Sequence, residues 1–168
     1  MSVVFRAAEV QDAAAIREVG IATWWATYTA LIPPKAITAV LRQSWHQKAI
    51  ETQIKSERYW VLVAQAADEL VGALFAASQV GCSGSVVIER LYVRPDFQGQ
   101  AVGYGLWRAL VERLPPAAQT VELDVLVNNT RALAFYERLG FVEIQRFVDS
   151  LSGVSLSLVR MSVSSPFP

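Results

Sequence analysis

The chain is short of the residues that build disulfides and metal sites. It holds one cysteine, Cys82, and one histidine, His46, among 168 residues. A single thiol cannot form an internal disulfide, which is mild evidence for a reducing compartment. His46 has no second histidine and no nearby cysteine, so we expect no metal site and interpret it as a solvated side chain. Cys82 lies in a Gly–Ser-rich turn without a histidine base, so we do not interpret it as a nucleophile.

The sequence also lacks net charge and long apolar runs. Fifteen Lys and Arg balance fifteen Asp and Glu, whereas a nucleic-acid-binding protein usually shows a basic excess. No window approaches the ~18 uncharged apolar residues of a membrane span. The first ten residues carry Arg6 and Glu9 and do not resemble a signal peptide. We therefore expect a cytoplasmic protein with neither a nucleic-acid nor a membrane partner.

Hydrophobic residues, in contrast, are plentiful. They make up 53% of the chain and include five tryptophans. A chain of this length buries roughly two-thirds of the surface that its unfolded form exposes. We find no internal repeat, linker or low-complexity tract, so we expect a single domain over residues 1–168.

The spacing of apolar residues predicts alternating strands and helices. Strands are expected at residues 3–7, 59–64, 70–79, 85–93, 120–127, 141–149 and 154–163. Helices are expected at residues 13–28, from Pro33–Pro34 to about Lys55 with Trp45 and Ala49 in its apolar stripe, at 103–114, and from Asn128 to a C′ glycine at Gly140. A turn around Ser152–Gly153 is expected to join the last two strands.

One part of this order predicts parallel strands. Strand 85–93, the helix after it and strand 120–127 form a βαβ unit, which normally has parallel strands and a right-handed crossover. The remaining strands follow one another closely and are expected to be antiparallel. The fold class is therefore α/β (α+β) with a mixed sheet.

The loop after Val93 is rich in glycine. Gly99, Gly103 and Gly105 lie within seven residues at the start of a helix. Backbone N–H groups at a helix N-terminus are unpaired, and glycine lets a pyrophosphate approach them closely. The loop is neither a P-loop nor a dinucleotide-binding motif. It is a candidate anion site, although a merely flexible strand–helix turn has the same composition.

A second segment, about 25 residues further on, gives this loop a context. It reads Asn129-x-x-Ala132-x-x-Phe135-Tyr136-Glu137-x-Leu139-Gly140-Phe141. With Leu91-Tyr92-Val93-Arg94-Pro95 and Gln98-x-x-Ala101-x-Gly103, it resembles the GNAT (GCN5-related N-acetyltransferase) superfamily. The order of elements is similar along almost the whole chain. The resemblance implies a twisted mixed sheet of six to seven strands with helices on both faces, in which the fourth and fifth strands splay apart.

The resemblance also implies acetyl-CoA as cosubstrate, with no metal. The pantetheine arm is expected on the free edge of strand 85–93, where the Val93 amide faces the thioester oxygen. The pyrophosphate is expected on the backbone of the loop Gln98–Tyr104. The implied acetyl-CoA-binding residues are Leu91, Tyr92, Val93, Gln98, Gly99, Gln100, Ala101, Val102, Gly103, Tyr104, Asn129, Ala132 and Phe135.

Ala101 departs from the family pattern, which usually has glycine there. Alanine keeps the amide donor but adds a methyl group and disfavours a positive φ. Pyrophosphate binding is then expected to require ordinary dihedrals at Ala101, and weaker acyl-CoA binding is the consequence to test.

Tyr136 matches the tyrosine that protonates the departing thiolate, although a half-buried helix residue would look the same. The base is less defined. Glu89 is the first candidate because period-two alternation places it on the face of Val87 and Leu91. Asp124 is the second, and ordered water is an alternative. Either carboxylate is otherwise a structural partner for an arginine or part of a solvated edge.

Trp24, Trp25, Tyr28 and Ile32 are the candidate acceptor-binding residues, with core packing as the alternative. The expected activity is transfer of an acetyl group to a primary amine of a small molecule or amino acid. A peptide or protein N-acetyltransferase and a non-catalytic acyl-CoA-binding module are the alternatives. The apolar strand 154–163 permits a homodimer.

Overall fold

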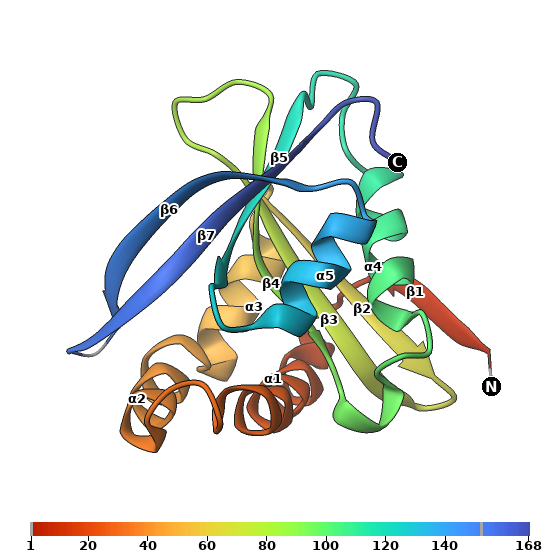
Figure 1. The fold of residues 1–168 in the computed structure, drawn as a ribbon. Coiled ribbons are helices and arrows are strands. Elements are labelled where there is room, and N and C mark those ends of the chain that lie inside the picture. Colours follow the sequence, from red (N-terminus) through yellow and green to blue (C-terminus); the bar gives the residue numbers. More distant parts are fainter. Residues whose placement is uncertain (1, 152) are drawn as a thin grey trace.

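The computed structural model describes residues 2–151 and 153–168. Their strands form one seven-stranded sheet in the order β1-β2-β3-β4-β5-β7-β6 (Figure 1). The strands are β1 (Val3–Ala7), β2 (Tyr59–Ala66), β3 (Glu69–Ser78), β4 (Ser85–Val93), β5 (Thr120–Leu126), β6 (Val142–Leu151) and β7 (Val154–Ser164). The helices are α1 (Ala13–Tyr28), α2 (Pro34–Ser44), α3 (Gln47–Lys55), α4 (Val102–Val111) and α5 (Thr130–Arg138), with short 3-10 turns η1 (Val10–Asp12) and η2 (Pro95–Phe97).

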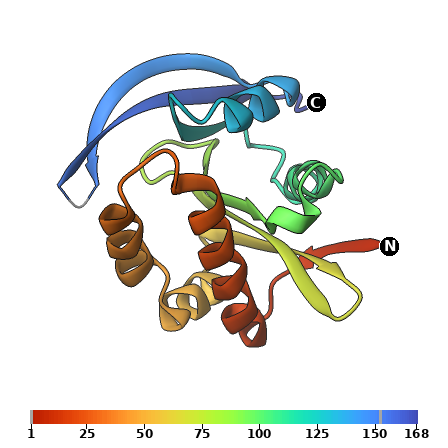
Figure 2. The same ribbon diagram turned by 60° about the horizontal axis from the view of Figure 1, so that its bottom comes forward.

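The sheet is mixed and covered on both faces, as the sequence predicts. β4 and β5 pair in parallel, and the other neighbouring strands pair antiparallel. Residues of α1 and α3 pack on one face against Val61, Val63 and Phe75. Residues of α4 and α5 pack on the opposite face (Figures 1 and 2). These two layers of helices leave the end of the sheet where β4 and β5 separate open to a ligand.

The parallel pair is short. Ser85–Val87 pairs with Thr120–Glu122, and no further pairing joins these strands in the parts of the chain described. β5 remains paired with β7 along its whole length. The remaining six residues of β4 therefore present an edge toward the gap, as the predicted splay requires.

The prediction of one helix from Pro34 to Lys55 is wrong, because Trp45 interrupts it. Trp45 leaves the helical region with φ −113° and ψ 45°, and its side chain is 1% exposed. The indole lies against Gly20 of α1, where even a Cβ atom would collide with the ring. The Arg17 Nε donates a 2.8 Å hydrogen bond to the Trp45 carbonyl. Seating the tryptophan in the core thus ends α2, and α3 restarts with Ile50 rather than Ala49 buried.

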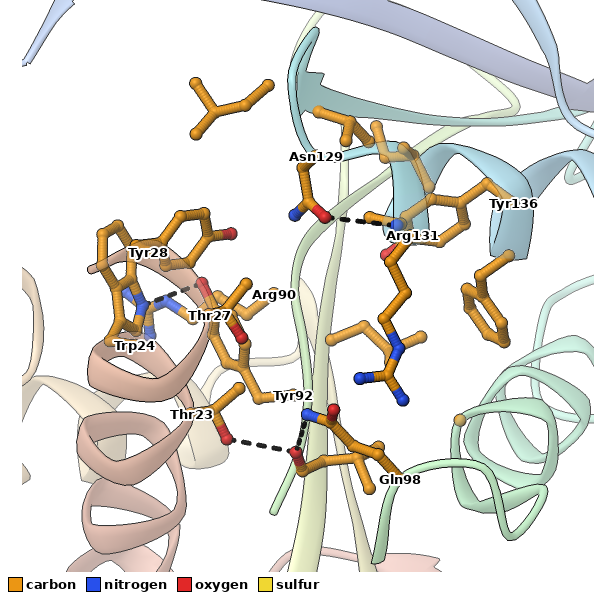
Figure 3. A pocket seen from close by; sticks show the side chains of 18 of the residues that line it. Thr23, Trp24, Thr27, Tyr28, Arg90, Tyr92, Gln98, Asn129, Arg131 and Tyr136 are labelled. Atoms are coloured by element: carbon orange, nitrogen blue, oxygen red, sulfur yellow. Dashed lines mark hydrogen bonds between the residues drawn. The ribbon is translucent and has the colours of Figure 1, made fainter. Parts of the chain in front are cut away.

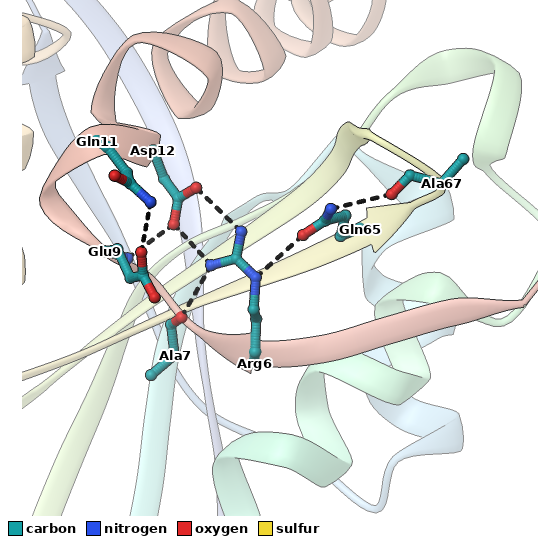
Figure 4. Close-up of polar contacts among 7 residues, drawn as sticks. All are labelled: Arg6, Ala7, Glu9, Gln11, Asp12, Gln65 and Ala67. Carbon is teal, nitrogen blue, oxygen red and sulfur yellow. Dashed lines mark hydrogen bonds and ion pairs between the residues drawn. The ribbon is translucent and has the colours of Figure 1, made fainter.

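An ion pair fastens the first strand to the first helix (Figure 4). Arg6 of β1 donates to both carboxylate oxygens of Asp12, at 2.7 and 3.0 Å, and to the Gln65 side chain of β2 at 3.0 Å. The Glu9 amide also donates to Asp12, at 2.7 Å. The Arg6 guanidinium lowers the pKa of the Asp12 carboxyl by hydrogen bonding. This bidentate contact sets where α1 starts relative to the sheet.

Two smaller expectations have clear outcomes. Gly140 follows the C-cap of α5 with φ +89°, which confirms it as the C′ glycine. His46 is exposed, as interpreted from the sequence, and Cys82 is exposed as well. Ser152 of the expected last turn lies outside the described residues. None of the described helices is long and apolar enough to cross a membrane.

Candidate active site

A cleft of about 1200 Å³ opens where β4 and β5 part (Figure 3). Its walls come from α1 and the segment after it, β4, the loop that precedes α4, β5, α5 and the β6–β7 hairpin. The predicted site residues that line it are Trp24, Tyr28, Ile32, Glu89, Leu91, Tyr92, Val93, Gln98, Gly99, Ala101, Val102, Gly103, Tyr104, Asp124, Asn129, Ala132, Phe135 and Tyr136.

Two predicted residues are not among those lining the cleft. Trp25 is 38% exposed, and only its neighbour Trp24 lines the cleft. The Gln100 side chain donates to the Asp96 carbonyl at 2.8 Å, within its own loop. Both were predicted because they are neighbours of other site residues along the chain. Such closeness in sequence does not tell which side of a helix or loop a residue occupies.

The end of β4 is held from two sides. The Arg94 amide donates to Val71 of β3 at 2.9 Å, so alternation along the strand turns the N–H and C=O of Val93 toward the gap. There the Val93 carbonyl accepts hydrogen bonds from the Thr23 hydroxyl at 3.3 Å and from Gln98 Nε2 at 2.9 Å. Thr23 is buried, at 4% exposure. These two contacts, visible in Figure 3, fix the direction in which the Val93 amide points.

A β-bulge at Glu89 changes which faces the β4 side chains occupy. Phe75 pairs with Arg90 but Ala76 pairs with Ile88, so Glu89 is the extra residue. Leu91 then packs in the core under α4 and α5, whereas Arg90 stacks on Trp45 beneath α1 and α3. The alternation predicted from the sequence is therefore wrong beyond Glu89, because Leu91 lies on the opposite face. The bulge puts a carboxylate and a guanidinium side by side at the cleft.

The loop before α4 brings backbone amides to the cleft, but Ala101 is strained. It has φ 61° and ψ 9°, in the left-handed region, and it is the N-cap of α4. The ordinary dihedrals that the sequence analysis made a condition for pyrophosphate binding are therefore not those of Ala101. Gly103, in the first turn of α4, lies so close to Phe135 of α5 that a Cβ atom would approach the ring to 3.1 Å. The first turn of α4 thus packs closely against the middle of α5, and both segments line the cleft.

Asn129 has a structural task that the sequence motif did not reveal. Its side-chain oxygen accepts from the Ala132 amide at 3.2 Å and caps α5. The cap leaves the side-chain amide group, which donates hydrogen bonds, as the part that can serve a ligand.

Tyr136 is buried at 9% exposure and still lines the cleft. Its ring contacts Phe141 at a centroid distance of 5.5 Å. Burial, and secondarily Tyr92, raises the pKa of the Tyr136 phenol above its ordinary value. The phenol therefore stays protonated at neutral pH and can act as a proton donor.

The two candidate bases have different partners. Glu89 accepts from the Tyr59 hydroxyl at 3.2 Å and lies 3.5 Å from Gln53 Nε2, both neutral donors. Asp124 receives two hydrogen bonds from Arg160 of β7, at 2.8 and 3.0 Å. Asp124 thus has an arginine partner, which is the structural alternative that the sequence analysis left open.

The acceptor side of the cleft is aromatic. Trp24 and Tyr28 pack with ring centroids 4.4 Å apart, and Trp24 Nε1 donates to the Tyr92 hydroxyl at 3.0 Å. Burial raises the pKa values of both Tyr28 and Tyr92. Nearby Arg90 is half-buried, stacks on Trp45 at 4.9 Å and donates to Gln53 and the Ser44 carbonyl.

Sequence reasoning missed several polar residues of this cleft, among them Thr23, Arg90 and Arg131. Thr23 gave no signal, because its partner is 70 positions away. Arg90 lies on β4 next to the candidate base, but only the bulge turns it under α1. Arg131 is a cation in the first turn of α5, where the helix dipole disfavours it. That unfavourable placement was the one available hint of a role.

Comparisons with known proteins agree with this arrangement. Residues 21–141 match the Acetyltransferase (GNAT) family. The ribosomal protein bS18-alanine N-acetyltransferase of Salmonella typhimurium is 36% identical over 90 residues, 53% of this chain and 59% of that protein. Its counterpart from Escherichia coli is 33% identical over 100 residues, 59% and 65% of the two chains. The chain thus matches about three-fifths of the length of these curated relatives.

Solved structures extend the likeness to nearly all residues. PaiA N-acetyltransferase from Thermoplasma acidophilum, in complex with coenzyme A, has a TM-score of 0.82 at 20% identity, covering 98% of this chain and 99% of that one. The ribosomal-protein-S18-alanine N-acetyltransferase from Escherichia coli has a TM-score of 0.73 at 18% identity, covering 97% and 94%. The fold is that of the GNAT acetyltransferases. With the family match over most of its length, the chain belongs to the Acetyltransferase (GNAT) family.

Proposed function

We propose that the chain is an N-acetyltransferase that moves an acetyl group from acetyl-CoA directly to a primary amine of a small molecule or amino acid. Family membership supports this proposal. The observation that carries it is the convergence of the unpaired edge of β4, the amides before α4 and the Tyr136 phenol on one cleft. We further propose that residues 1–168 act as one catalytic domain.

The donor side fits acetyl-CoA in its shape and chemistry. The pantetheine arm pairs with the free edge of β4 at Leu91 and Val93, which satisfies backbone groups that β5 leaves open. The pyrophosphate lies on the amides of the Gln98–Tyr104 loop at the α4 N-terminus. Phe135 and Ala132 flank the arm from α5. A structurally similar N-acetyltransferase in complex with coenzyme A supports the choice of this donor.

The reaction then needs three things from the protein. The amine nitrogen attacks the thioester carbonyl carbon, and the Val93 N–H stabilises the negative charge that develops on its oxygen. Tyr136 donates its proton to the sulfur as the carbon–sulfur bond breaks. The attacking ammonium must first lose a proton, because an alkyl amine with a pKa of about 10.4 is mostly charged at neutral pH.

We assign that proton transfer to Glu89, directly or through ordered water. Glu89 has neutral hydrogen-bond donors around it and is the extra residue of the bulge in β4, where it lines the cleft. Asp124 is the weaker candidate, because its bidentate contact with Arg160 already uses both oxygens.

The test is release of CoA from acetyl-CoA across a panel of amines and amino acids, with Tyr136→Phe as the control. A second candidate function is acetylation of a peptide N-terminus, favoured by the bS18-alanine N-acetyltransferases among its relatives. A peptide that begins with alanine therefore belongs in the panel. If acetyl-CoA binds and every acceptor fails, the chain is a non-catalytic acyl-CoA-binding module. A titration that shows no affinity for acetyl-CoA refutes the proposed function altogether.

A further inference from the structure

The acceptor side of the cleft has two apolar walls that face one another. One wall comes from the end of α1 and the segment after it, and the other from β5 and β7. All of these side chains both line the cleft and pack in one cluster: Trp24, Tyr28, Leu31, Ile32, Leu126, Leu156 and Leu158. We call this part of the cleft the acceptor lobe. Figure 3 shows Trp24 and Tyr28 across β4 from Gln98 and Arg131 on the donor side.

The charges along the cleft do not favour a polycation. Three carboxylates line it, Glu89, Asp124 and Asp149, and three guanidinium groups, Arg90, Arg131 and Arg138. Asp124 is neutralised by Arg160, which pairs with it from β7. A substrate with several ammonium groups needs a surplus of carboxylates, because an unpaired charge in an apolar site is costly. On the acceptor side, Asp124 has Arg160 and Glu89 has Arg90 beside it, so among the described residues Asp149 is one carboxylate without an arginine partner rather than a surplus of several.

The lobe is equally unsuited to a peptide. Each residue of a peptide brings an N–H and a C=O group that must find partners when they leave water. The side chains of Leu31, Ile32, Leu156 and Leu158 offer none. An apolar body, in contrast, gains free energy from every methylene that these walls remove from water.

We propose that the acceptor is a primary amine with a single positive charge on an aliphatic or aromatic body, and that this body lies in the acceptor lobe. The inference rests on the proposed function and narrows its substrate class. The amine points from the lobe toward the thioester, with Glu89 on the same side of β4. The lobe then selects acceptors by apolar area rather than by charge.

A homologous series of amines tests this directly. We expect kcat/KM for n-alkylamines, at saturating acetyl-CoA, to rise about fourfold per methylene from ethylamine to hexylamine, since each buried methylene contributes about 0.8 kcal/mol. The amines share nearly the same pKa, so basicity does not confound the series. Hexylamine should exceed 1,6-diaminohexane at least tenfold. A flat series, or a preference for the diamine or for an alanine peptide, overturns the inference while leaving the proposed function intact.

Two neighbouring variants on β7 sharpen the result. Leu156 lines the cleft, whereas Ser157 is exposed and points away from it. Leu156→Glu should shift the preference from hexylamine toward 1,6-diaminohexane by tenfold or more, and Ser157→Glu should leave the ratio unchanged. Equal shifts in both variants contradict the inference. If Leu156→Glu does not fold, the amine series on the natural chain decides alone.

The acyl donor supplies the remaining control, because a long acyl chain could fill the same lobe. We expect octanoyl-CoA to be a poorer donor to hexylamine than acetyl-CoA, since chain and acceptor compete for the same walls. A preference for octanoyl-CoA together with a flat amine series assigns the lobe to the acyl chain and overturns the inference. Failure of every amine despite acetyl-CoA binding is different, because it defeats the proposed function itself.

Discussion

Replacing Ala101 by glycine tests separately how the backbone strain at this position affects folding stability and how it affects acetyl-CoA binding. Ala101 holds φ 61° and ψ 9° at the N-terminus of α4. An L-residue in the left-handed region costs roughly 1–2 kcal/mol, which glycine does not incur. Glycine loses about 0.4–1 kcal/mol through the greater freedom of the unfolded chain. The difference predicts that Ala101→Gly raises the free energy of unfolding by roughly 0.5–1 kcal/mol.

The same substitution should barely change the affinity for acetyl-CoA. Ala101 is left-handed in the structure, so its amide already points as a glycine amide would, and we expect the same dihedrals with acetyl-CoA bound. The strain is then present before and after binding and cancels from the dissociation constant. We expect the Kd for acetyl-CoA to change less than about twofold. Because tenfold in Kd corresponds to about 1.4 kcal/mol, this change in binding free energy is much smaller than the gain of about 1 kcal/mol in folding.

Thermal unfolding and isothermal titration measure the two quantities on the same samples. For a chain of this size, ~1 kcal/mol corresponds to a rise in Tm of roughly 2–4 °C. Ala67 is a matched control, because it also has a positive φ, 50°, and lies in the turn between β2 and β3 away from the cleft. Ala67→Gly should give a similar gain in Tm without touching acetyl-CoA. A tenfold tighter Kd for Ala101→Gly with no gain in Tm refutes the reasoning, because the strain would then arise only on binding.

Three further perturbations test the site and its frame. Thr23→Val removes the buried hydroxyl from the Val93 carbonyl and should lower kcat about tenfold with little change in KM for acetyl-CoA, whereas Thr23→Ser should retain kcat; equal loss in both variants contradicts a positioning role. Tyr136→Phe should lower kcat by about 10²–10³ without lowering Tm, and an unchanged kcat removes Tyr136 from the mechanism. Arg6 lowers the pKa of Asp12 below its ordinary 3.8, so their pair stabilises the fold above that pH and loses its effect as the carboxyl is protonated in acid. Arg6→Gln should therefore cost ~2 kcal/mol at pH 7 and less at pH 3, where part of the stabilisation is already lost, as measured by urea unfolding; an equal cost at both pH values contradicts this assignment.

Much of the fold was accessible from the sequence because its signals are local. The strand 85–93 was predicted with both boundaries correct, and the mixed sheet follows from one βαβ unit. The break at Trp45 was not accessible, because the helical spacing continues through it. What ends the helix is a tryptophan that finds its place against Gly20, far away in sequence.

The sequence predicted those site residues that belong to motifs. It did not predict the positions of residues that depend on an irregularity of the backbone. The motifs correctly placed Tyr136 and the loop Gln98–Tyr104, except Gln100, in the cleft. The bulge at Glu89 depends on how β4 pairs with β3, so alternation assigned Leu91 to the wrong face. Catalytic roles and the pairing of two copies through β7 remain predictions, because they concern reactions and partners rather than the geometry of one chain.

The short pairing of β4 with β5 has a mechanical consequence. Among the described residues, β4 and β5 pair only at Ser85–Val87 and Thr120–Glu122, and the Gly84 carbonyl just before β4 accepts from the amides of Gln119 and Thr120. Acetyl-CoA that pairs with the rest of β4 adds hydrogen bonds along an edge that β5 leaves unpaired. The unpaired amides of Leu91 and Val93 should then exchange with deuterium quickly in the free protein and slowly once acetyl-CoA is bound. In that sense the cosubstrate acts as a temporary strand of the sheet. Each turnover forms and then breaks hydrogen bonds along the edge of β4.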